Sequence, residues 1–354
     1  MNNIYLEFIR REAENSGLVI ATVTESVGST PQKPGSSALF CSKGLLTGTV
    51  GGGVVEGKVQ ESAVSGAGTK ESVYLHFNLS NDISNKYEAI CGGKTAVLVD
   101  ANPQVHLPEF KKAAKSLSEN KAGVLITMVT TLRGSKVLIN RYWMSPDIIP
   151  VIPPEFMEKI GPEVEAMLSS RLAGDFRKLE LAIPGEEPAS MFFLEMLLPS
   201  DHLIIAGAGH IGKVLAHLGK MLDFEVTVID DRKDFANKQN IPDADQIIVK
   251  DIGEAVRETV KNPKTYIVIV TRGHNNDAEA LRSCIGSDAA YIGMIGSKAK
   301  TAKIRQDFIL NKWSDEDQWR RVFTPIGLEI GSKTVEEIAI SIAAQLIMIK
   351  NKAK

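Results

Sequence analysis

Three glycines, Gly207, Gly209 and Gly212, and an acid, Asp230, have the types and the spacing of a turn that binds a dinucleotide. In such a turn the first glycine makes the tight bend, the second lets the backbone approach a pyrophosphate, and the third lets the helix pack closely on the strand. The N-terminus of the following helix offers N–H groups and a positive dipole end to the anion. We therefore expect the glycines to bind phosphate and Asp230 to accept a hydrogen bond from a ribose hydroxyl.

Two side chains beside this turn could add to the binding of such a ligand. His210 lies between the glycines, where the positive end of the helix dipole favours a neutral hydrogen-bonding group over a cation. Arg232 follows two residues after the acid and could receive a 2′-phosphate. The choice between NAD and NADP therefore stays open.

A second loop that carries ionisable side chains follows another apolar run in this half of the chain. Arg272 can pair with an anion next to Gly273, and His274 can be an acid, a base or a ligand. Asp277 is placed to cap a helix that begins at Ala278. Two interpretations stay open: His274 is a catalytic residue, or it only orders a capped turn.

A third loop of this kind begins at Gly296, which frees the backbone. Ser297 can cap the next helix, and Lys298 and Lys300 lie in its first turn. Cations at this end oppose the helix dipole, which favours an anion bound between the two lysines. The alternative is that both lysines are simply solvated.

The first half of the chain has its own glycine-rich turn and one cysteine of interest. Gly52 and Gly53 precede a predicted helix and could form an anion cradle of backbone N–H groups, with Glu56 in the first helical turn. The alternative is a tight structural turn. Cys91 is followed by two glycines, and its thiolate is a soft metal ligand. The alternative for Cys91 is a buried, inert thiol.

The elements that must position these residues follow two different patterns. Residues 1–196 predict one mixed α+β domain that includes a proline-rich middle section. Residues 200–354 alternate strands and helices and predict a Rossmann-like α/β domain, a doubly wound parallel sheet. The strands predicted there are 202–206, 225–230, 246–249, 265–270, 290–295 and 321–323. Predicted helices include 54–64, 162–172 and 334–349.

Composition excludes several classes of protein. The net charge is −2 over 354 residues, which gives no basic footprint for nucleic acid. No apolar run approaches the roughly 18–20 residues that span a bilayer, and the charged first residues do not fit a secretory signal. Three cysteines without CxxC spacing favour neither a disulfide framework nor a zinc site. We therefore expect a cytoplasmic protein that binds neither nucleic acid nor membrane.

Taken together, the motifs resemble those of the XdhC/CoxI family, the accessory proteins of molybdenum hydroxylases such as xanthine dehydrogenase and carbon monoxide dehydrogenase. The resemblance covers most of the chain and is strongest in the second half. In the first half it rests on Gly28, Ser29, Pro31, Gly52, Gly53, Glu56 and Cys91 with its two glycines. In the second half it rests on 207–212, 271–274, Asp277, 291–293, 295–297, 325–328, Ile330, Gly331 and 336–339.

The resemblance implies a function that composition does not give. Proteins of this family bind the molybdenum cofactor (molybdopterin), protect it during sulfuration and deliver it to the apo-hydroxylase. The expected partners are therefore an apo molybdenum hydroxylase and a sulfurase. The resemblance places the cofactor against the glycine turn, near His210, Arg272 and His274.

One departure from the family matters for how the cofactor is held. In the family a cysteine commonly follows the two glycines, and this chain has Val54 there, which cannot ligate a metal. Gln32 stands where the family often has a basic residue. Either Cys91 substitutes as a molybdenum thiolate ligand, or the cofactor is held without a thiolate, or this branch has another role.

Three functions stay open at this point. The first is a cofactor-binding and delivery protein. The second is an NAD(P)-dependent oxidoreductase with His274 as general acid, although no second catalytic partner is evident. The third is a nucleotide-sensing regulatory subunit without chemistry. We also expect a homodimer formed through the apolar helix 334–349, the alternative being that this helix packs on its own sheet.

Overall fold

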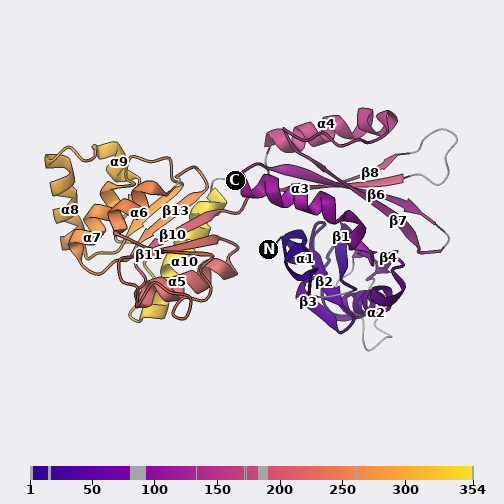
Figure 1. Ribbon diagram of the computed structural model, residues 1–354, viewed down its shortest axis with the longest axis horizontal. Coiled ribbons are helices and arrows are strands. Elements are labelled where there is room, and N and C mark those ends of the chain that lie inside the picture. The colour runs from indigo at the N-terminus through magenta and orange to yellow at the C-terminus, as the bar shows by residue number, and fades with distance from the viewer. Residues whose placement is uncertain are drawn as a thin grey trace. The chain divides into compact units, whose positions relative to one another are not determined.

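The computed structural model divides into two compact units, Met1–Pro199 and Ser200–Lys354 (Figure 1). No helix in the described residues is long and apolar enough to cross a membrane. The structure describes the backbone of His274 and not its side chain. The described residues are 3–14, 17–79, 93–132, 134–170, 172, 174–181, 190–259 and 261–352.

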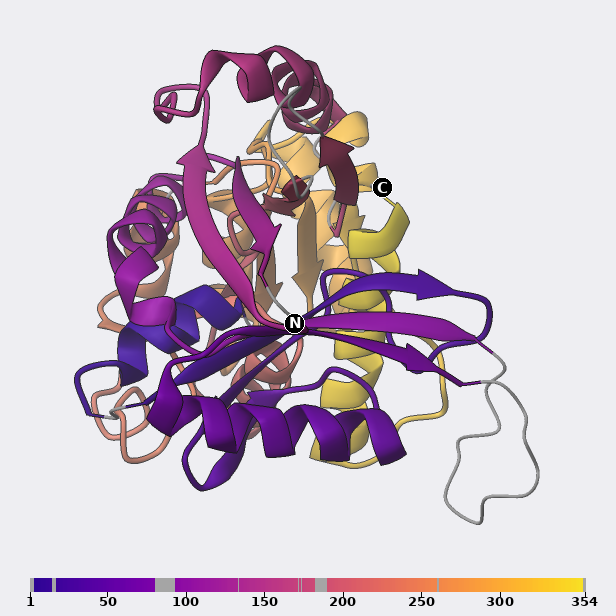
Figure 2. The same cartoon turned by 90° about the vertical axis from the view of Figure 1, so that its right-hand side faces the viewer.

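The first unit contains a five-stranded antiparallel sheet with helix α2 (Gly53–Thr69) along one face (Figure 2). Every second residue of its central strand, such as Val19, Ala21 and Val23, faces this helix, because side chains alternate between the faces of a strand. The strands in spatial order are β3 Gly44–Gly48, β2 Ser37–Cys41, β1 Val19–Val27, β5 Lys94–Asp100 and β4 Val73–Asn78.

A second antiparallel sheet, of four strands, lies in the same unit. Its strands in spatial order are β7 Val137–Met144, β6 Gly123–Thr131, β9 Ser190–Leu197 and β8 Phe176–Leu181. The other helices of the unit are α1 Ile4–Arg11, η1 Pro103–His106, α3 Leu107–Ser118 and α4 Pro154–Ser170. Helix α4 packs on one face of this sheet. Helices α1 and α3 share a core with residues of both sheets, such as Ile20 and Leu125.

The second unit is built on a six-stranded sheet whose strands all run parallel. In spatial order they are β12 Gln246–Val249, β11 Glu225–Asp230, β10 His202–Ala206, β13 Thr265–Ile269, β14 Tyr291–Met294 and β15 Val322–Phe323. The first three strands along the chain extend the sheet in one direction and the last three in the other. The strand order therefore reverses between β10 and β13, as it does in dinucleotide-binding folds.

Helices cover both faces of the parallel sheet. One face carries α5 His210–Met221 and α10 Val335–Lys352. The other carries α6 Ile252–Glu258, α7 His274–Arg282, α8 Lys298–Leu310 and α9 Glu316–Arg320. The two apolar cores are centred on side chains such as Leu215 and Phe308, which are fully buried. The predictions of a doubly wound α/β second half and a mixed α+β first half are confirmed.

The bounds of one predicted helix were wrong. The helix predicted at 162–172 begins at Pro154, and Pro162 lies inside it. Buried Ile160 and Val164 keep the helical spacing on both sides of the proline. Pro162 itself is exposed, so the apolar face of α4 continues through a residue that usually marks a helix start.

Candidate functional site

The predicted site residues of the second unit meet at one edge of the parallel sheet. Because the strands are parallel, the loops after β11, β10, β13 and β14 leave the sheet at the same carboxyl edge, in that spatial order. Ligands of open parallel sheets bind outside this edge, where the strand order reverses. The strand ends, loops and helix starts at this edge carry Asp230 and Arg232, the turn 207–212 with His210, Arg272 and Gly273, and Gly296, Ser297 and Lys298.

The turn between β10 and α5 is a closely packed backbone cradle. Gly207 has a φ of +122°, and a Cβ there would lie 2.5 Å from the carbonyl oxygen of Val270. A Cβ on Gly212 would lie 1.9 Å from the carbonyl oxygen of Gly207, so only glycine lets α5 approach the turn. At Gly209 the Cβ position has no atom within 4 Å, and no side chain caps α5. The N–H groups of the first helical turn are therefore accessible to an anion.

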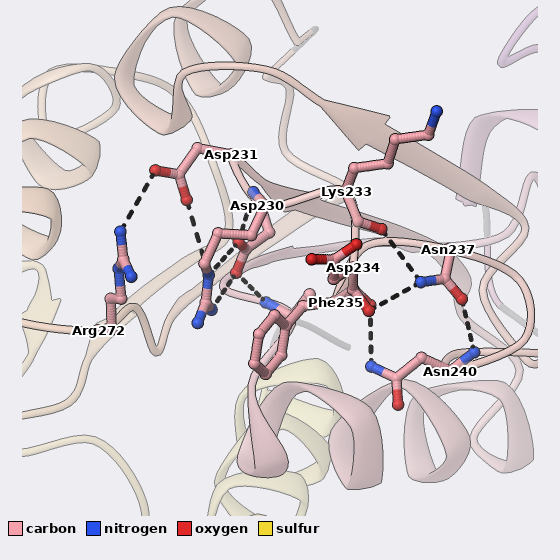
Figure 3. Close-up of polar contacts among 10 residues, drawn as sticks. Asp230, Asp231, Lys233, Asp234, Phe235, Asn237, Asn240 and Arg272 are labelled. Carbon is pink, nitrogen blue, oxygen red and sulfur yellow. Dashed lines mark hydrogen bonds and ion pairs between the residues drawn. The ribbon is translucent and has the colours of Figure 1, made fainter.

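Asp230 lies beside this turn, and its carboxylate is held by four donors (Figure 3). Its Oδ2 accepts from the N–H of Ala208 at 2.8 Å and from Nη2 of Arg232 at 2.8 Å. Its Oδ1 accepts from the backbone N–H of Arg232 at 3.0 Å and from Nε at 2.8 Å. Burial raises the pKa of Asp230, but the hydrogen bonds from Arg232 and Ala208 outweigh burial and lower the pKa to about 2. The acid is therefore ionised and fully engaged by the protein.

A surface cavity of about 450 Å³ lies next to the turn. Phe235 forms part of its wall and lies under the guanidinium of Arg232, whose carbon is 3.9 Å from the ring centroid. His210 is exposed at the start of α5 and also lines the cavity. The remaining lining residues are Ala208, Gly209, Lys213, Asp234, Asn237, Gln239 and Asn240.

Residues 234–240 of the cavity wall were not predicted from the sequence. The amide groups of Asn237 and Asn240 hold the loop by hydrogen bonds to the backbone carbonyls of Lys233, Asp234 and Phe235 (Figure 3). The sequence signal was present as one aromatic and three amides at positions 235 to 240, a few residues after the acid of β11. Such a run is typical of any polar loop, which is why it did not stand out.

The helix that follows β13 starts earlier than the sequence predicts. Helix α7 begins at His274, with Gly273 as N-cap at a φ of +92°, so the prediction that Asp277 caps a helix starting at Ala278 was wrong. The buried carboxylate of Asp277 instead accepts from the N–H of Thr271 at 3.1 Å and from its hydroxyl at 2.6 Å. This acid therefore fixes the loop from inside the helix.

Arg272 projects from the same loop into solvent. Its side chain is 65% exposed, and Nη2 lies 4.0 Å from Oδ2 of Asp231 (Figure 3). The Nε of Arg232 lies 3.8 Å from Oδ1 of the same Asp231. The two guanidinium groups therefore lie on either side of one carboxylate at the carboxyl edge.

The loop after β14 uses its two lysines differently. Ser297 is the N-cap of α8 and accepts from the N–H of Lys300 at 3.3 Å, as the sequence predicts. The ammonium of Lys300 binds the buried carboxylate of Asp277. Lys298 is exposed. The prediction that both lysines face an anion is therefore wrong for Lys300, whose charge balances Asp277 instead.

The glycine-rich turn of the first unit lies at one end of the five-stranded sheet. The Cβ positions of Gly52 and Gly53 have no atom within 4 Å, and no side chain caps α2. Glu56 accepts a hydrogen bond of 3.2 Å from the hydroxyl of Thr49. The backbone of this turn is open, which an anion cradle requires.

The metal prediction falls on a residue that the structure does not cover. Cys91 lies outside the described residues. Nearby Gly93 is described, and a Cβ there would lie 2.5 Å from the carbonyl oxygen of Ser29. Within the described residues, no group of three or more His, Cys, Asp and Glu side chains is placed to hold a metal ion.

Both halves of the chain match models of known protein families. Residues 203–346 match the XdhC Rossmann domain. Residues 12–78 match the XdhC and CoxI family. The chain belongs to the XdhC/CoxI family.

Relatives of this XdhC/CoxI protein are found in Bacillus and in Escherichia. It is 25% identical, over 94% of its length and 93% of the relative's, to a probable xanthine dehydrogenase subunit of Bacillus subtilis. It is 21% identical to the uncharacterized protein YqeB of Escherichia coli, of which it spans 47%. The crystal structure of a xanthine dehydrogenase from Bacillus halodurans has a TM-score of 0.73 at 25% identity, covering 99% of this chain and 96% of that one.

Several motif residues of this XdhC/CoxI protein hold α10 on the sheet rather than a ligand. The hydroxyl of Tyr291 donates to Gln345 of α10 at 2.5 Å. The Oε1 atom of Gln345 also accepts a hydrogen bond from the N–H of Gly327 at 3.0 Å. A Cβ on Gly327 would lie 2.2 Å from the hydroxyl oxygen of Ser341. The motifs at 291–293 and 325–328 therefore have a structural reason in the packing of α10.

Proposed function

We propose that this protein binds the molybdenum cofactor at the carboxyl edge of its parallel sheet and delivers it to an apo molybdenum hydroxylase. The observation that carries the proposal is the open glycine turn between β10 and α5, at the point where the strand order reverses. Two similar proteins have xanthine dehydrogenase in their names. The three cysteines of this chain are too few to ligate two iron–sulfur clusters, which favours an accessory role over that of the hydroxylase.

The residues at the turn fit the phosphate of a pterin cofactor. Gly209 leaves the N–H groups at the start of α5 accessible, and a helix N-terminus favours an anion. The cavity beside the turn offers the ring of Phe235 and the side chain of His210 to a flat, nitrogen-rich ring. One ligand can therefore place its phosphate at the turn and its ring in the adjacent cavity.

The cofactor is cargo in this proposal and brings its own metal. The chain then needs residues for the phosphate and the ring, and it needs no full set of metal ligands. Val54 in place of the family's cysteine fits this division, because valine cannot bind a metal. Cys91 stays a candidate thiolate ligand on the grounds of its chemistry alone.

A second candidate function is favoured by the strand order. The order β12-β11-β10-β13-β14-β15 is that of dinucleotide-binding folds. NAD(P) is therefore the alternative ligand, in an oxidoreductase or in a nucleotide-sensing subunit. His274 is the acid that the oxidoreductase version requires.

Delivery is tested by activation of an apo-hydroxylase with a cofactor-loaded protein. We expect wild-type protein to activate the hydroxylase faster than free cofactor does. The Gly209→Ala variant should lose this advantage, because its methyl group stands where the phosphate approaches. Gly57→Ala, in an open position of α2, is the matched control. Equal activation by wild type and Gly209→Ala would contradict the proposal.

Assembly and location follow from the same proposal. We place the protein in the cytoplasm, with the hydroxylase and a sulfurase as partners. Helix α10 buries one stripe in the core, and Ile340 and Ile347 on it are 52% and 39% exposed. We propose that these two side chains contribute to a homodimer. Sedimentation of Ile340→Glu, compared with wild type, tests this.

A further inference from the structure

We infer that the ligand places a phosphate monoester, and not a ribose with free hydroxyls, beside the end of β11, and that Arg232 selects it. The inference rests on the proposed role of the glycine turn as the cofactor site. It specifies which group of the ligand lies next to that turn. Asp230 is the residue that a ribose would need, and its contacts decide between the two groups.

Asp230 has no acceptor capacity left for a ribose. A carboxylate has about four lone-pair sites, and Asp230 already accepts four hydrogen bonds, all between 2.8 and 3.0 Å. Its side chain is 1% exposed. A ligand hydroxyl would therefore have to displace a bond of the bidentate ion pair with Arg232. This displacement is unfavourable, because the lost hydrogen bond joins two charged groups and is stronger than the bond that a neutral hydroxyl would donate in its place.

Arg232, in contrast, keeps donors for a ligand. A guanidinium has five N–H donors, and in the described part of the chain its side-chain bonds use Nε and Nη2. Its side chain is 22% exposed. The ion pair with Asp230 and the ring of Phe235 hold the guanidinium in place. The ring of Phe235, which lies under this guanidinium, also forms part of the cavity wall beside the glycine turn.

A second guanidinium strengthens the case for an anion with two charges. Arg232 and Arg272 both lie near Asp231, at 3.8 Å and 4.0 Å. Within the described residues Arg272 makes no other ion pair, and its side chain is 65% exposed. Planar guanidinium groups bind phosphate by pairs of hydrogen bonds. A monoester between the two would exchange the weak contacts to Asp231 for direct ones.

The experiment compares two pairs of ligands that differ by one phosphate monoester. The first pair is NADP⁺ and NAD⁺, and the second is neopterin monophosphate and neopterin. Binding to the full chain is measured by titration calorimetry. We expect the phosphorylated member of at least one pair to bind about tenfold or more tightly, and the pair that shows this identifies the source of the phosphate. Arg232→Ala should abolish the preference and free Asp230 for a hydroxyl.

Two further variants keep the test decisive. Lys233→Ala removes the same charge from the next, exposed residue, whose ammonium points away from the pair (Figure 3), and it should keep the preference. The double variant Asp230→Asn, Arg232→Gln leaves no unpaired buried charge and should lose the preference as Arg232→Ala does. Binding of all four ligands without a preference, or a preference that survives in both Arg232 variants, overturns the inference alone. If none of the four binds, the proposed use of the turn falls with it.

Discussion

The guanidinium of Arg232 and the carboxylate of Asp230 form a bidentate ion pair at the end of β11, with both hydrogen bonds at 2.8 Å. The two residues are separated by one position in the sequence. Their pairing leaves a saturated acid and a partly available guanidinium beside the glycine turn. What the ligand carries at this place therefore depends on Arg232, whereas its approach to the backbone depends on Gly209.

We expect Gly209→Ala to bind the cofactor poorly while folding normally. The φ of −73° at Gly209 suits alanine, and its Cβ position is empty, so the methyl group meets the ligand and not the protein. The thermal midpoint should stay near that of wild type, and the amount of co-purified ligand should fall by about tenfold or more. Gly57→Ala is also unobstructed and should retain the ligand. Retention of ligand by Gly209→Ala would place the phosphate elsewhere.

Loss of Lys300 should reduce stability rather than affinity. Its ammonium balances the buried carboxylate of Asp277, so Lys300→Ala leaves that charge with Thr271 alone and should cost about 2–4 kcal/mol of unfolding free energy. Urea unfolding measures the change. Exposed Lys298→Ala is the control and should alter stability by less than about 0.5 kcal/mol. Unchanged stability in Lys300→Ala together with weakened anion binding would restore the anion role that the sequence suggested.

Gly327→Ala should destabilise the second unit without direct contact to the ligand. The new methyl group would meet the hydroxyl oxygen of Ser341 at 2.2 Å, in a backbone with φ of +94°. We expect a loss of about 2–4 kcal/mol, from overpacking and backbone strain together. Gly331→Ala has a φ of +76° and an empty Cβ position, so it reports the strain alone. Equal losses in the two variants would show that the approach of α10 to Gly327 is not tight.

The contribution of Glu195 to the stability of the first unit should fall as the pH rises. Burial of this carboxyl, opposed by the hydroxyl of Tyr5 at 2.5 Å and the charge of Arg141, raises its pKa from 4.5 to about 7. Between these values the folded chain holds a proton that the unfolded chain has released, so unfolding free energy falls with rising pH, by roughly 3 kcal/mol in all. Glu195→Gln should remove this fall, between pH 4.5 and about pH 7, in urea unfolding.

His106 contributes to the same measurement with the opposite sign. Burial and the charge of Arg141 lower its pKa from 6.5 to about 4, so its contribution to stability is lost as the pH falls through that range. Glu195→Gln leaves His106 in place, and the difference from wild type isolates the carboxyl. Exposed Glu61→Gln is the control and should follow wild type. A parallel pH dependence in Glu195→Gln and wild type would mean that Glu195 is ionised when folded.

Spacing in the sequence was sufficient to predict the parts of the fold that depend on local pattern. The strand at 246–249 and the turn from Gly207 to Gly212 are local signals, and both are present in the structure. Helix α3 was not predicted, although Pro108 lies in its first turn. Proline is in fact favoured in the first turn of a helix.

The use of all four acceptor sites of Asp230 by donors of the protein could not be predicted in the same way. Its bond to Ala208 joins the end of β11 to the turn after β10, and its pairing with Arg232 depends on the backbone direction after β11. The pairing of Lys300 with Asp277 likewise joins residues 23 positions apart on two helices. Sequence reasoning identified the charged groups at this edge but assigned them to a ligand, whereas several of them neutralise one another.

The ligand carried by the native protein tests the central claim most directly. The protein would be purified from a molybdenum-replete host, with metal analysis of the native protein and mass spectrometry of the released small molecules. Molybdenum and a pterin in near-stoichiometric amounts, lost in Gly209→Ala, are the predicted result. NAD(P) without molybdenum would contradict the account and favour the oxidoreductase or the nucleotide sensor.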